Sequence, residues 1–176
     1  MELTFKDDRS NNYLNIFSTI FIYMNFKIAI PSSNRSKDIN KKTLRMLCFF
    51  SYDILPKDIY VFVSEDEIED YENNNTFGVN IIRGEKGIKQ NRKALSDYFD
   101  EGEYIDDDLT NVFKLHINKG GKQVLRKVDS LRLFIEDTIK RMKEENIKMA
   151  GLYPVENPFF MKNLVSIDCR FIIGNF

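Results

Sequence analysis

The chain has 176 residues, of which 43% are hydrophobic and 30% charged, and its formal net charge is -1. These values are typical of one soluble globular domain, and they argue against a duplex-binding protein with a general basic excess, although a local basic patch is compatible with them. Cys48 and Cys169 lie far apart and His116 is the only histidine. This inventory argues against structural zinc and favours a reducing, intracellular compartment, the cytoplasm.

The first 25 residues are interpreted as an N-terminal extension, and residues 26–176 are expected to form one domain. The run from Tyr13 to Phe26 is largely apolar but is interrupted by Asn and Ser side chains. Because a bilayer span needs about 20 apolar residues, we expect a packed helix or an extra strand here and no transmembrane segment. A membrane-surface anchor is the alternative.

Strands and helices alternate in the first half of the domain. Apolar and β-branched runs predict strands, and polar caps before amphipathic runs predict helices. The first predicted elements are a strand at 27–30, closed by Pro31, and a helix capped by 36–38 whose Leu44, Leu47 and Cys48 face inward. A strand at 59–63, a short helix at 65–71 and a strand at 79–82 follow. The last are a helix at 87–99, with Ile88, Leu95 and Tyr98 as its apolar positions, and a short strand at 104–105.

The second half begins with a period of two. Phe113, Leu115 and Ile117 alternate with polar residues, and a Lys-Gly-Gly turn follows, which predicts a hairpin that returns through Val124. Ser130 then caps a helix whose apolar stripe is formed by Leu131, Phe134, Ile135, Thr138, Ile139 and Met142. Further strands are predicted at 150–153 and 165–173.

This order predicts an α/β fold with a central, mostly parallel sheet flanked by helices. Ligands of such sheets bind beyond the carboxyl ends of the strands. The segments that follow the predicted strands should therefore form one rim, made of Pro31–Arg35, Ser64–Glu67, Arg83–Arg92 and Asp106–Asp108.

The acidic triplet is the strongest candidate for chemistry in this rim. Asp106, Asp107 and Asp108 follow a buried strand, and alternation would send Asp106 and Asp108 to one side. Two carboxylates on one side repel each other unless a cation lies between them, and Mg²⁺ or Mn²⁺ suits hard oxygen ligands. A solvated acidic loop is the alternative.

Three other segments offer ligand-binding groups. The turn after the first strand carries Ser32, Asn34 and Arg35, whose groups suit a nucleotide, and Arg83–Arg92 places Gly87 and cationic side chains at a helix start that suits an anion. Gly151–Met161 is an aromatic, Pro-punctuated loop that suits a sugar. An ordinary turn, a capped helix and a packing loop are the respective alternatives. His116 is interpreted as a structural or surface histidine.

Together these segments, with Thr43-Leu44, Tyr60–Val63 and Tyr153–Asn157, resemble the GT-A glycosyltransferases. Within that family they resemble a group of large DNA viruses and phages, which includes the TET-associated glycosyltransferases. The resemblance covers residues 26–176, and it implies a virus or an infected host cell as the source. It implies a Rossmann-like sheet, a nucleotide-diphosphate sugar donor such as a UDP-sugar, Mn²⁺ or Mg²⁺, and a glycan or modified-DNA hydroxyl as acceptor.

The resemblance also implies residue roles. Pro31, Ser32, Asn34, Arg35, Gly87 and Arg92 would contact the donor, and Asp66 would face the nucleobase. Asp106 and Asp108 would hold the metal, with Asp107 as a donor contact or a substitute ligand. Members of the family usually continue beyond the last strand, so a C-terminally truncated domain is expected, with Glu156 and Asp168 as candidate bases. A non-catalytic nucleotide-sugar-binding module and an interaction domain with an acidic loop are the alternative functions.

Overall fold

The structure is a computed structural model that describes residues 26–50, 54–99, 103–147 and 150–151. The extension at 1–25, the strand expected at 165–173 and the candidate bases Glu156 and Asp168 lie outside the described residues. So does the second half of the strand expected at 150–153, and Ala150 and Gly151 belong to no strand.

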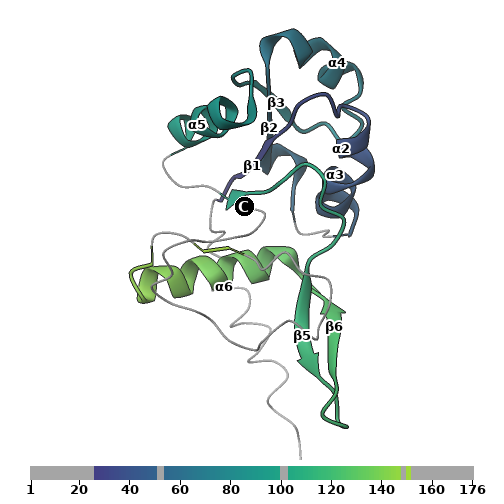
Figure 1. Ribbon diagram of the computed structural model, residues 1–176, viewed down its shortest axis with the longest axis vertical. Helices are drawn as coiled ribbons and strands as arrows, with labels where there is room; N and C mark the ends of the chain where they lie inside the picture. Colours follow the sequence, from purple (N-terminus) through teal and green to yellow (C-terminus); the bar gives the residue numbers. More distant parts are fainter. Residues whose placement is uncertain (1–25, 51–53, 100–102, 148–149, 152–176) are drawn as a thin grey trace, which may run out of the picture.

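A parallel sheet forms the centre of the domain (Figure 1). Its strands are β1 (Ile28–Pro31), β2 (Ile59–Val63), β3 (Asn80–Arg83) and the two-residue β4 (Glu103–Tyr104), in the order β3-β2-β1-β4. Every neighbouring pair runs parallel. The mixed α/β class with a parallel sheet is therefore confirmed.

Both faces of this sheet are covered, which explains why its two central strands, β1 and β2, are continuous apolar runs. Because side chains alternate along a strand, Ile28 and Ile30 join one core cluster and Ala29 joins the other. In β2, Val61 and Phe62 divide between the two clusters in the same way.

Helices cover each face separately (Figure 1). One side packs against Leu95 of α5 (Ile88–Tyr98). The other packs against a group of short helices, namely α2 (Asp38–Lys41), α3 (Thr43–Arg45), the π-helical turn η1 (Met46–Phe50) and α4 (Ile68–Asn73). Single 3-10 turns, η2 (Pro56–Asp58) and η3 (Glu65–Glu67), lie immediately before and after β2.

The helix expected after residue 36 is broken at Lys42, whose φ and ψ of -111° and -98° are not helical. Its inner face still forms as predicted, since Leu44 and Leu47 are buried. The capping prediction is wrong, because the Ser36 hydroxyl donates to the Asp70 carboxylate and no side chain caps α2.

One prediction for the neighbouring elements also needs correction. The third strand begins at Asn80, one residue later than expected. Of the apolar positions of α5, Ile88 and Tyr98 are 62% and 54% exposed. Asn91 and Leu95 are the buried positions of this helix, so the face that packs on the sheet is centred on its middle turns.

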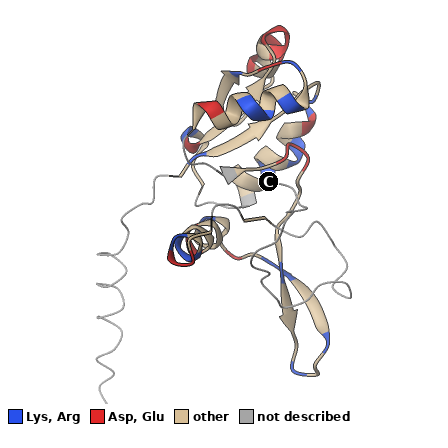
Figure 2. Ribbon diagram, turned by 60° about the vertical axis from the view of Figure 1, so that its left-hand side comes forward, with Lys and Arg blue, Asp and Glu red and all other residues tan. Residues whose placement is uncertain are grey.

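The hairpin and the last helix form as predicted. β5 (Phe113–Ile117) pairs antiparallel with β6 (Gln123–Lys127), and the ribbon extends away from the sheet (Figures 1 and 2). Ser130 caps α6 (Leu131–Glu144) by accepting a hydrogen bond from the Leu133 amide at 3.0 Å.

Helix α6 belongs to the main core, because its Leu131 and Ile135 are buried in the same cluster as β1 and β2. The Arg132 guanidinium lies 4.9 Å from the centre of the Phe26 ring, which fixes the helix beside the start of β1. Among the described residues, no helix is both long and apolar enough to cross a membrane.

Candidate functional site at the carboxyl edge of the sheet

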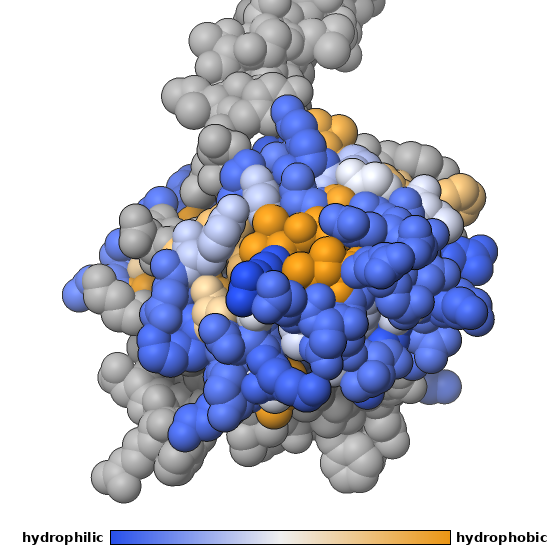
Figure 3. Space-filling model, turned by 90° about the horizontal axis from the view of Figure 1, so that it is seen from above, coloured by the Kyte–Doolittle hydropathy of each residue, from blue (hydrophilic) through white to orange (hydrophobic). Residues whose placement is uncertain are grey.

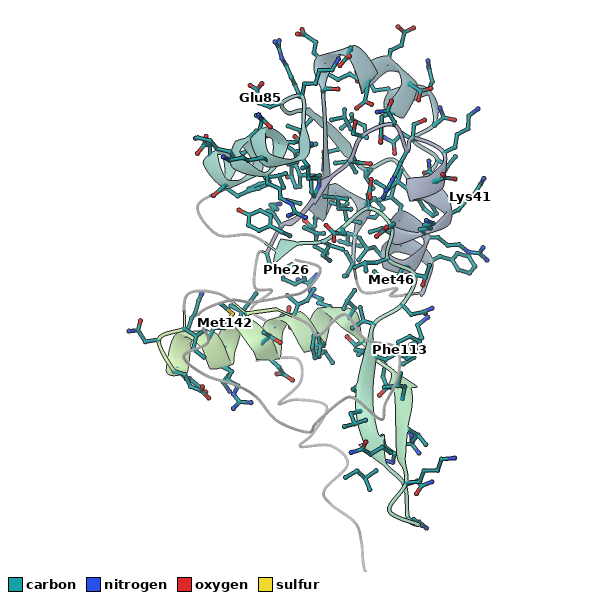
Figure 4. The ribbon with its side chains drawn as sticks, in the orientation of Figure 1. Phe26, Lys41, Met46, Glu85, Phe113 and Met142 are labelled. Atoms are coloured by element: carbon teal, nitrogen blue, oxygen red, sulfur yellow. The ribbon has the colours of Figure 1, made fainter. Side chains whose placement is uncertain are left out.

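The four rim segments meet at one edge, because all four strands run in the same direction. Viewed from above, this face has apolar side chains in its middle and hydrophilic ones around them (Figure 3). Glu85 lies at this edge, while Phe26 and Met46 lie towards the opposite end of the strands (Figure 4). The rim predicted from the sequence is therefore present.

Asp107 is the centre of the edge between β1 and β4. Only 8% of its surface is exposed. One carboxylate oxygen accepts from the Ser32 hydroxyl at 2.5 Å, and the other accepts from Nη1 of Arg35 at 2.6 Å. These bonds satisfy a buried charge that would otherwise be very costly. They join the turn after β1 to the acidic loop after β4, two segments that the sequence placed in one rim.

Tyr71 completes this network from α4. Its phenol oxygen lies 2.7 Å from the Ser32 hydroxyl and accepts from the Arg35 amide at 3.0 Å. Burial raises the pKa of Tyr71, so the phenol stays protonated. Sequence reasoning missed this residue, because an aromatic side chain at the end of a short helix is normally assigned to the core.

Asp106 and Asp108 are held more loosely than Asp107. Asp106 accepts from Nη2 of Arg92 at 3.3 Å, and Asp108 accepts from Nη1 of Arg35 at 3.4 Å. Burial raises the pKa of Asp106; Arg92 opposes the rise, and the carboxylates of Asp108 and Asp107 add to it. The triplet therefore retains an excess of negative charge despite its two arginines.

Thr43 fixes the backbone of the acidic loop. Its fully buried hydroxyl donates to the Asp106 carbonyl at 2.8 Å and accepts from the Leu109 amide at 2.9 Å. Both ends of the triplet are thus tied to the start of α3. The loop itself belongs to no helix or strand, so these bonds tie its backbone to the domain.

The triplet passes a test of donor chemistry for a divalent cation. Carboxylate oxygens suit Mg²⁺ or Mn²⁺, and the two most weakly held carboxylates are those of Asp106 and Asp108. Asp107 has its oxygens committed to Ser32 and Arg35. In the part of the chain that the structure describes, no three acidic, Cys or His side chains are arranged so that they could hold a metal ion. A cation would therefore have to displace Arg35 and Arg92 from these two aspartates.

The turn after β1 is fixed from a second direction by Glu67. This carboxylate accepts from the Asn34 amide at 2.7 Å, the Ser33 hydroxyl at 3.1 Å and the Ser64 hydroxyl at 3.0 Å. Asn34 has a φ of 55°, a left-handed conformation that asparagine tolerates well. Its side chain donates to the Ser33 hydroxyl and faces solvent, so the carbonyl of its amide is available to a ligand.

A shallow hollow of about 400 Å³ lies on the other half of the edge, beyond β2 and β3. Its residues are charged and small, namely Ser64, Glu65, Asp66, Arg83, Gly84, Glu85 and Lys86. Two exposed ion pairs cross it, Asp66 with Lys86 at 2.9 Å and Glu65 with Arg83 at 2.8 Å. Hydrogen bonding from Ser64 and Lys86 lowers the pKa of Asp66 to about 2.

The start of α5 follows directly after the residues that line this hollow. Gly87 precedes the helix with a φ of 95°, which only glycine adopts readily. The buried Asn91 side chain donates to the Phe62 carbonyl at 2.9 Å and accepts from the Glu85 amide at 3.3 Å. Gly84 allows this contact, because a Cβ there would lie 2.0 Å from Oδ1 of Asn91.

The remaining predicted site residues are placed as follows. Pro31 is the last residue of β1, in register with Phe62. Arg92 lies one position after Asn91, and it reaches Asp106 from α5. His116 lies in β5 opposite Val124, outside this edge.

Comparison of the chain with protein families, with curated proteins and with solved structures gives no significant match. The geometry of the edge is thus the basis for assigning a function.

Proposed function

We propose that the chain is a metal-dependent glycosyltransferase domain of the GT-A type, with a Rossmann-like sheet. It would transfer a sugar from a nucleotide-diphosphate donor, such as a UDP-sugar, to a hydroxyl of a glycan or of modified DNA. One observation carries this proposal: the aspartate triplet after β4 contacts Ser32 and Arg35 after β1 at the carboxyl edge of a parallel sheet. Ligands of such sheets bind at this edge.

The proposed cation is Mn²⁺ or Mg²⁺, held by Asp106 and Asp108. When bound, such an ion stabilises the negative charge that develops on a departing diphosphate. Asp107 would position the loop by keeping its bonds to Ser32 and Arg35. The raised pKa of Asp106, which burial causes and to which the neighbouring carboxylates add, supports this assignment, because a cation would stabilise the charged form.

The two arginines would then act on the donor. Arg35 and Arg92 now neutralise the triplet from opposite sides. A divalent ion on Asp106 and Asp108 would release Arg92, and it would release Arg35 from Asp108 while Arg35 keeps its bond to Asp107. The forked donors of both guanidinium groups suit phosphate oxygens. Metal and donor would therefore bind cooperatively, each making the other's binding groups available.

The rest of the edge is long enough for the donor. Neighbouring strands lie about 4.8 Å apart, so the ends of β2, β1 and β4 together span about 10 Å. Asp66 at the hollow would face the nucleobase, Ser32 and Asn34 the middle of the donor, and the aspartates the diphosphate. Gly87 permits close approach at the start of α5.

A non-catalytic nucleotide-sugar-binding module is the second candidate. It is favoured by the ion pairing of all three aspartates in the structure, since such pairing also explains the triplet as a clasp between two loops. This candidate predicts donor binding without any turnover.

The first experiment is thermal unfolding with a panel of nucleotide sugars, with and without Mn²⁺. A donor at 100 times its Kd would stabilise the domain by about 2.7 kcal/mol, which raises Tm by roughly 5–10 °C in a protein of this size. We expect a shift that needs both Mn²⁺ and a nucleotide sugar. A Tm that neither component changes would contradict the proposal.

Two variants locate the effect. Asp108→Asn removes one proposed ligand from an exposed position, so it should abolish the Mn²⁺-dependent shift and turnover while the fold persists. Asp97→Asn is the matched control, because Asp97 is an exposed carboxylate of α5 that pairs with Lys93 outside the triplet. Full metal-dependent turnover in Asp108→Asn would refute the assigned role.

A further inference from the structure

The β5–β6 hairpin differs from the rest of the chain in charge. Residues 113–128 contain no Asp or Glu, whereas the whole chain has a net charge of -1. Five basic side chains lie in this segment, and all are exposed: Lys114, Lys119, Lys122, Arg126 and Lys127. In Figure 2 they appear along the ribbon and at its tip, without acidic residues between them.

The arrangement of these charges is unfavourable for the hairpin alone. Lys114 and Arg126 are directly opposite each other in the antiparallel register, so their side chains share one face. Like charges in this position destabilise a sheet, and an isolated two-stranded hairpin is marginally stable. Asp129 neutralises only part of the pair, by accepting from Lys114 at 2.9 Å.

The turn at the tip of the hairpin carries basic side chains next to glycines, which have no side chain. Lys119 and Lys122 flank Gly120 and Gly121, and the turn is closed by the Asn118 side chain, which accepts from the Gly120 and Lys122 amides. The strands therefore end in a narrow, basic tip that projects from the domain (Figure 1).

We propose that the β5–β6 hairpin binds duplex nucleic acid, with its tip in the major groove and its basic side chains on the flanking phosphates. The major groove is wide enough for a two-stranded β-ribbon, and charge complementarity comes from both strands and the turn. An anionic membrane fits less well, since the exposed apolar residues Phe113 and Ile117 belong to β5, and the turn itself carries only Asn, Lys and Gly. This surface is independent of the proposed nucleotide-sugar site.

The test is fluorescence anisotropy with a labelled DNA duplex of random sequence, about 20 bp or two helical turns long. If each of the five side chains contacts one phosphate, log Kobs should fall with log salt with a slope of about -4.5. We expect the variant Lys119→Ser/Lys122→Ser/Arg126→Ser to reduce this slope to about -2.

The matched control is Lys37→Ser/Lys57→Ser/Lys93→Ser, which removes the same charge from exposed positions outside the hairpin. It should keep the wild-type slope. Should the first variant fail to fold by circular dichroism, Lys119→Ser/Lys122→Ser changes only the turn and should reduce the slope by about 2.

Three outcomes would overturn the proposal. The first is the absence of duplex binding at low salt, and the second is an equal loss of binding in the hairpin and control variants. The third is preferential binding to phosphatidylserine vesicles over the duplex, which would assign the hairpin to a membrane surface. None of them depends on whether the chain binds nucleotide sugars, so this proposal and the glycosyltransferase proposal fail separately.

Discussion

The two halves of the carboxyl edge are built differently. Between β1 and β4, Asp107 and Ser32 are buried and bonded to each other, with Arg35 and Tyr71 adding further contacts. Beyond β2 and β3, the ion pairs are exposed and surround a hollow. Buried polar networks contribute to stability and fix geometry, whereas exposed ion pairs contribute little. Substitutions in the first half should thus change stability, and those in the second should change mainly ligand binding.

The strongest test of this difference is Asp107→Ala. It leaves Ser32 without its acceptor and Arg35 without its main partner, so we expect a loss of about 3 kcal/mol in the free energy of unfolding, at the low end for a broken buried pair because Arg35 is half-exposed. Urea unfolding measures this loss. Asp108→Ala is the control and should lose less than about 1 kcal/mol. Equal losses would mean that the triplet is not divided into one anchoring carboxylate and two that are held more loosely.

A second prediction concerns the buried contact behind the hollow. Gly84→Ala places a Cβ against Oδ1 of Asn91, so the amide must leave the Phe62 carbonyl and the Glu85 amide. We expect a loss of about 2 kcal/mol, comparable to leaving buried polar groups unpaired.

Combination with Asn91→Ala sharpens this prediction. Removing the Asn91 side chain removes the clash, so the double variant should lose less stability than the sum of the two single variants, by at least about 0.5 kcal/mol. Chemical unfolding of the three variants gives this coupling energy directly. Additive losses would show that Gly84 is needed for another reason.

A smaller effect is expected from Tyr71→Phe. This variant keeps the ring in the core but removes the oxygen that accepts from the Arg35 amide and contacts Ser32. The loss should be about 1–2 kcal/mol, because the Arg35 amide becomes unpaired. Tyr98→Phe, at an exposed position, should change stability by less than about 0.5 kcal/mol. If Tyr71→Phe is as stable as the wild type, the phenol contributes nothing to the stability of the network.

The smallest effect on stability is expected for loss of the exposed Asp66–Lys86 ion pair at the hollow. Asp66 has its pKa lowered to about 2, against an ordinary value of about 3.9. A depressed folded-state pKa stabilises the fold above the unfolded value, and this contribution is lost as the pH falls through about 2. The pair with Lys86 should therefore persist across the whole physiological range.

Lys86→Gln tests that pair by NMR titration of the Asp66 carboxyl carbon. The Ser64 hydroxyl has a single proton, which its 3.0 Å bond gives to Glu67, so Lys86 is expected to maintain most of the shift. The midpoint should move upward in Lys86→Gln and stay unchanged in Lys89→Gln, while urea unfolding detects no difference. If the midpoint does not move in Lys86→Gln, the hydrogen bond from Ser64 would be the cause of the lowered pKa of Asp66.

Local pattern was sufficient for much of the fold. The strand at Ile59–Val63 and the Ser130 cap follow from sequence signals that act within a few residues. The rim followed from one topological rule, because parallel strands place their carboxyl ends together. The proximity of the acidic loop to the turn after β1 was therefore foreseeable, whereas the choice of Asp107 as the partner of Ser32 and Arg35 was not.

The missed features depend on contacts between distant parts of the chain. Tyr71 meets Ser32 39 positions away, and Thr43 meets Asp106 63 positions away. Neither residue type signals such a role locally, since a tyrosine suits a core and a threonine suits many positions. The break at Lys42 and the exposure of Ile88 are likewise decided by packing, which periodicity alone does not encode.

The hydroxyl of Thr43 has a mechanical consequence. One continuous stretch of backbone runs from the aspartates through Leu109 and Val112 into the ribbon, so a partner that pulls on the ribbon also pulls on this stretch. The Thr43 hydroxyl bonds to the Leu109 amide, between the aspartates and the β5–β6 hairpin. We expect this bond to hold the backbone in place at Leu109. A force on the hairpin would then not displace the carboxylates.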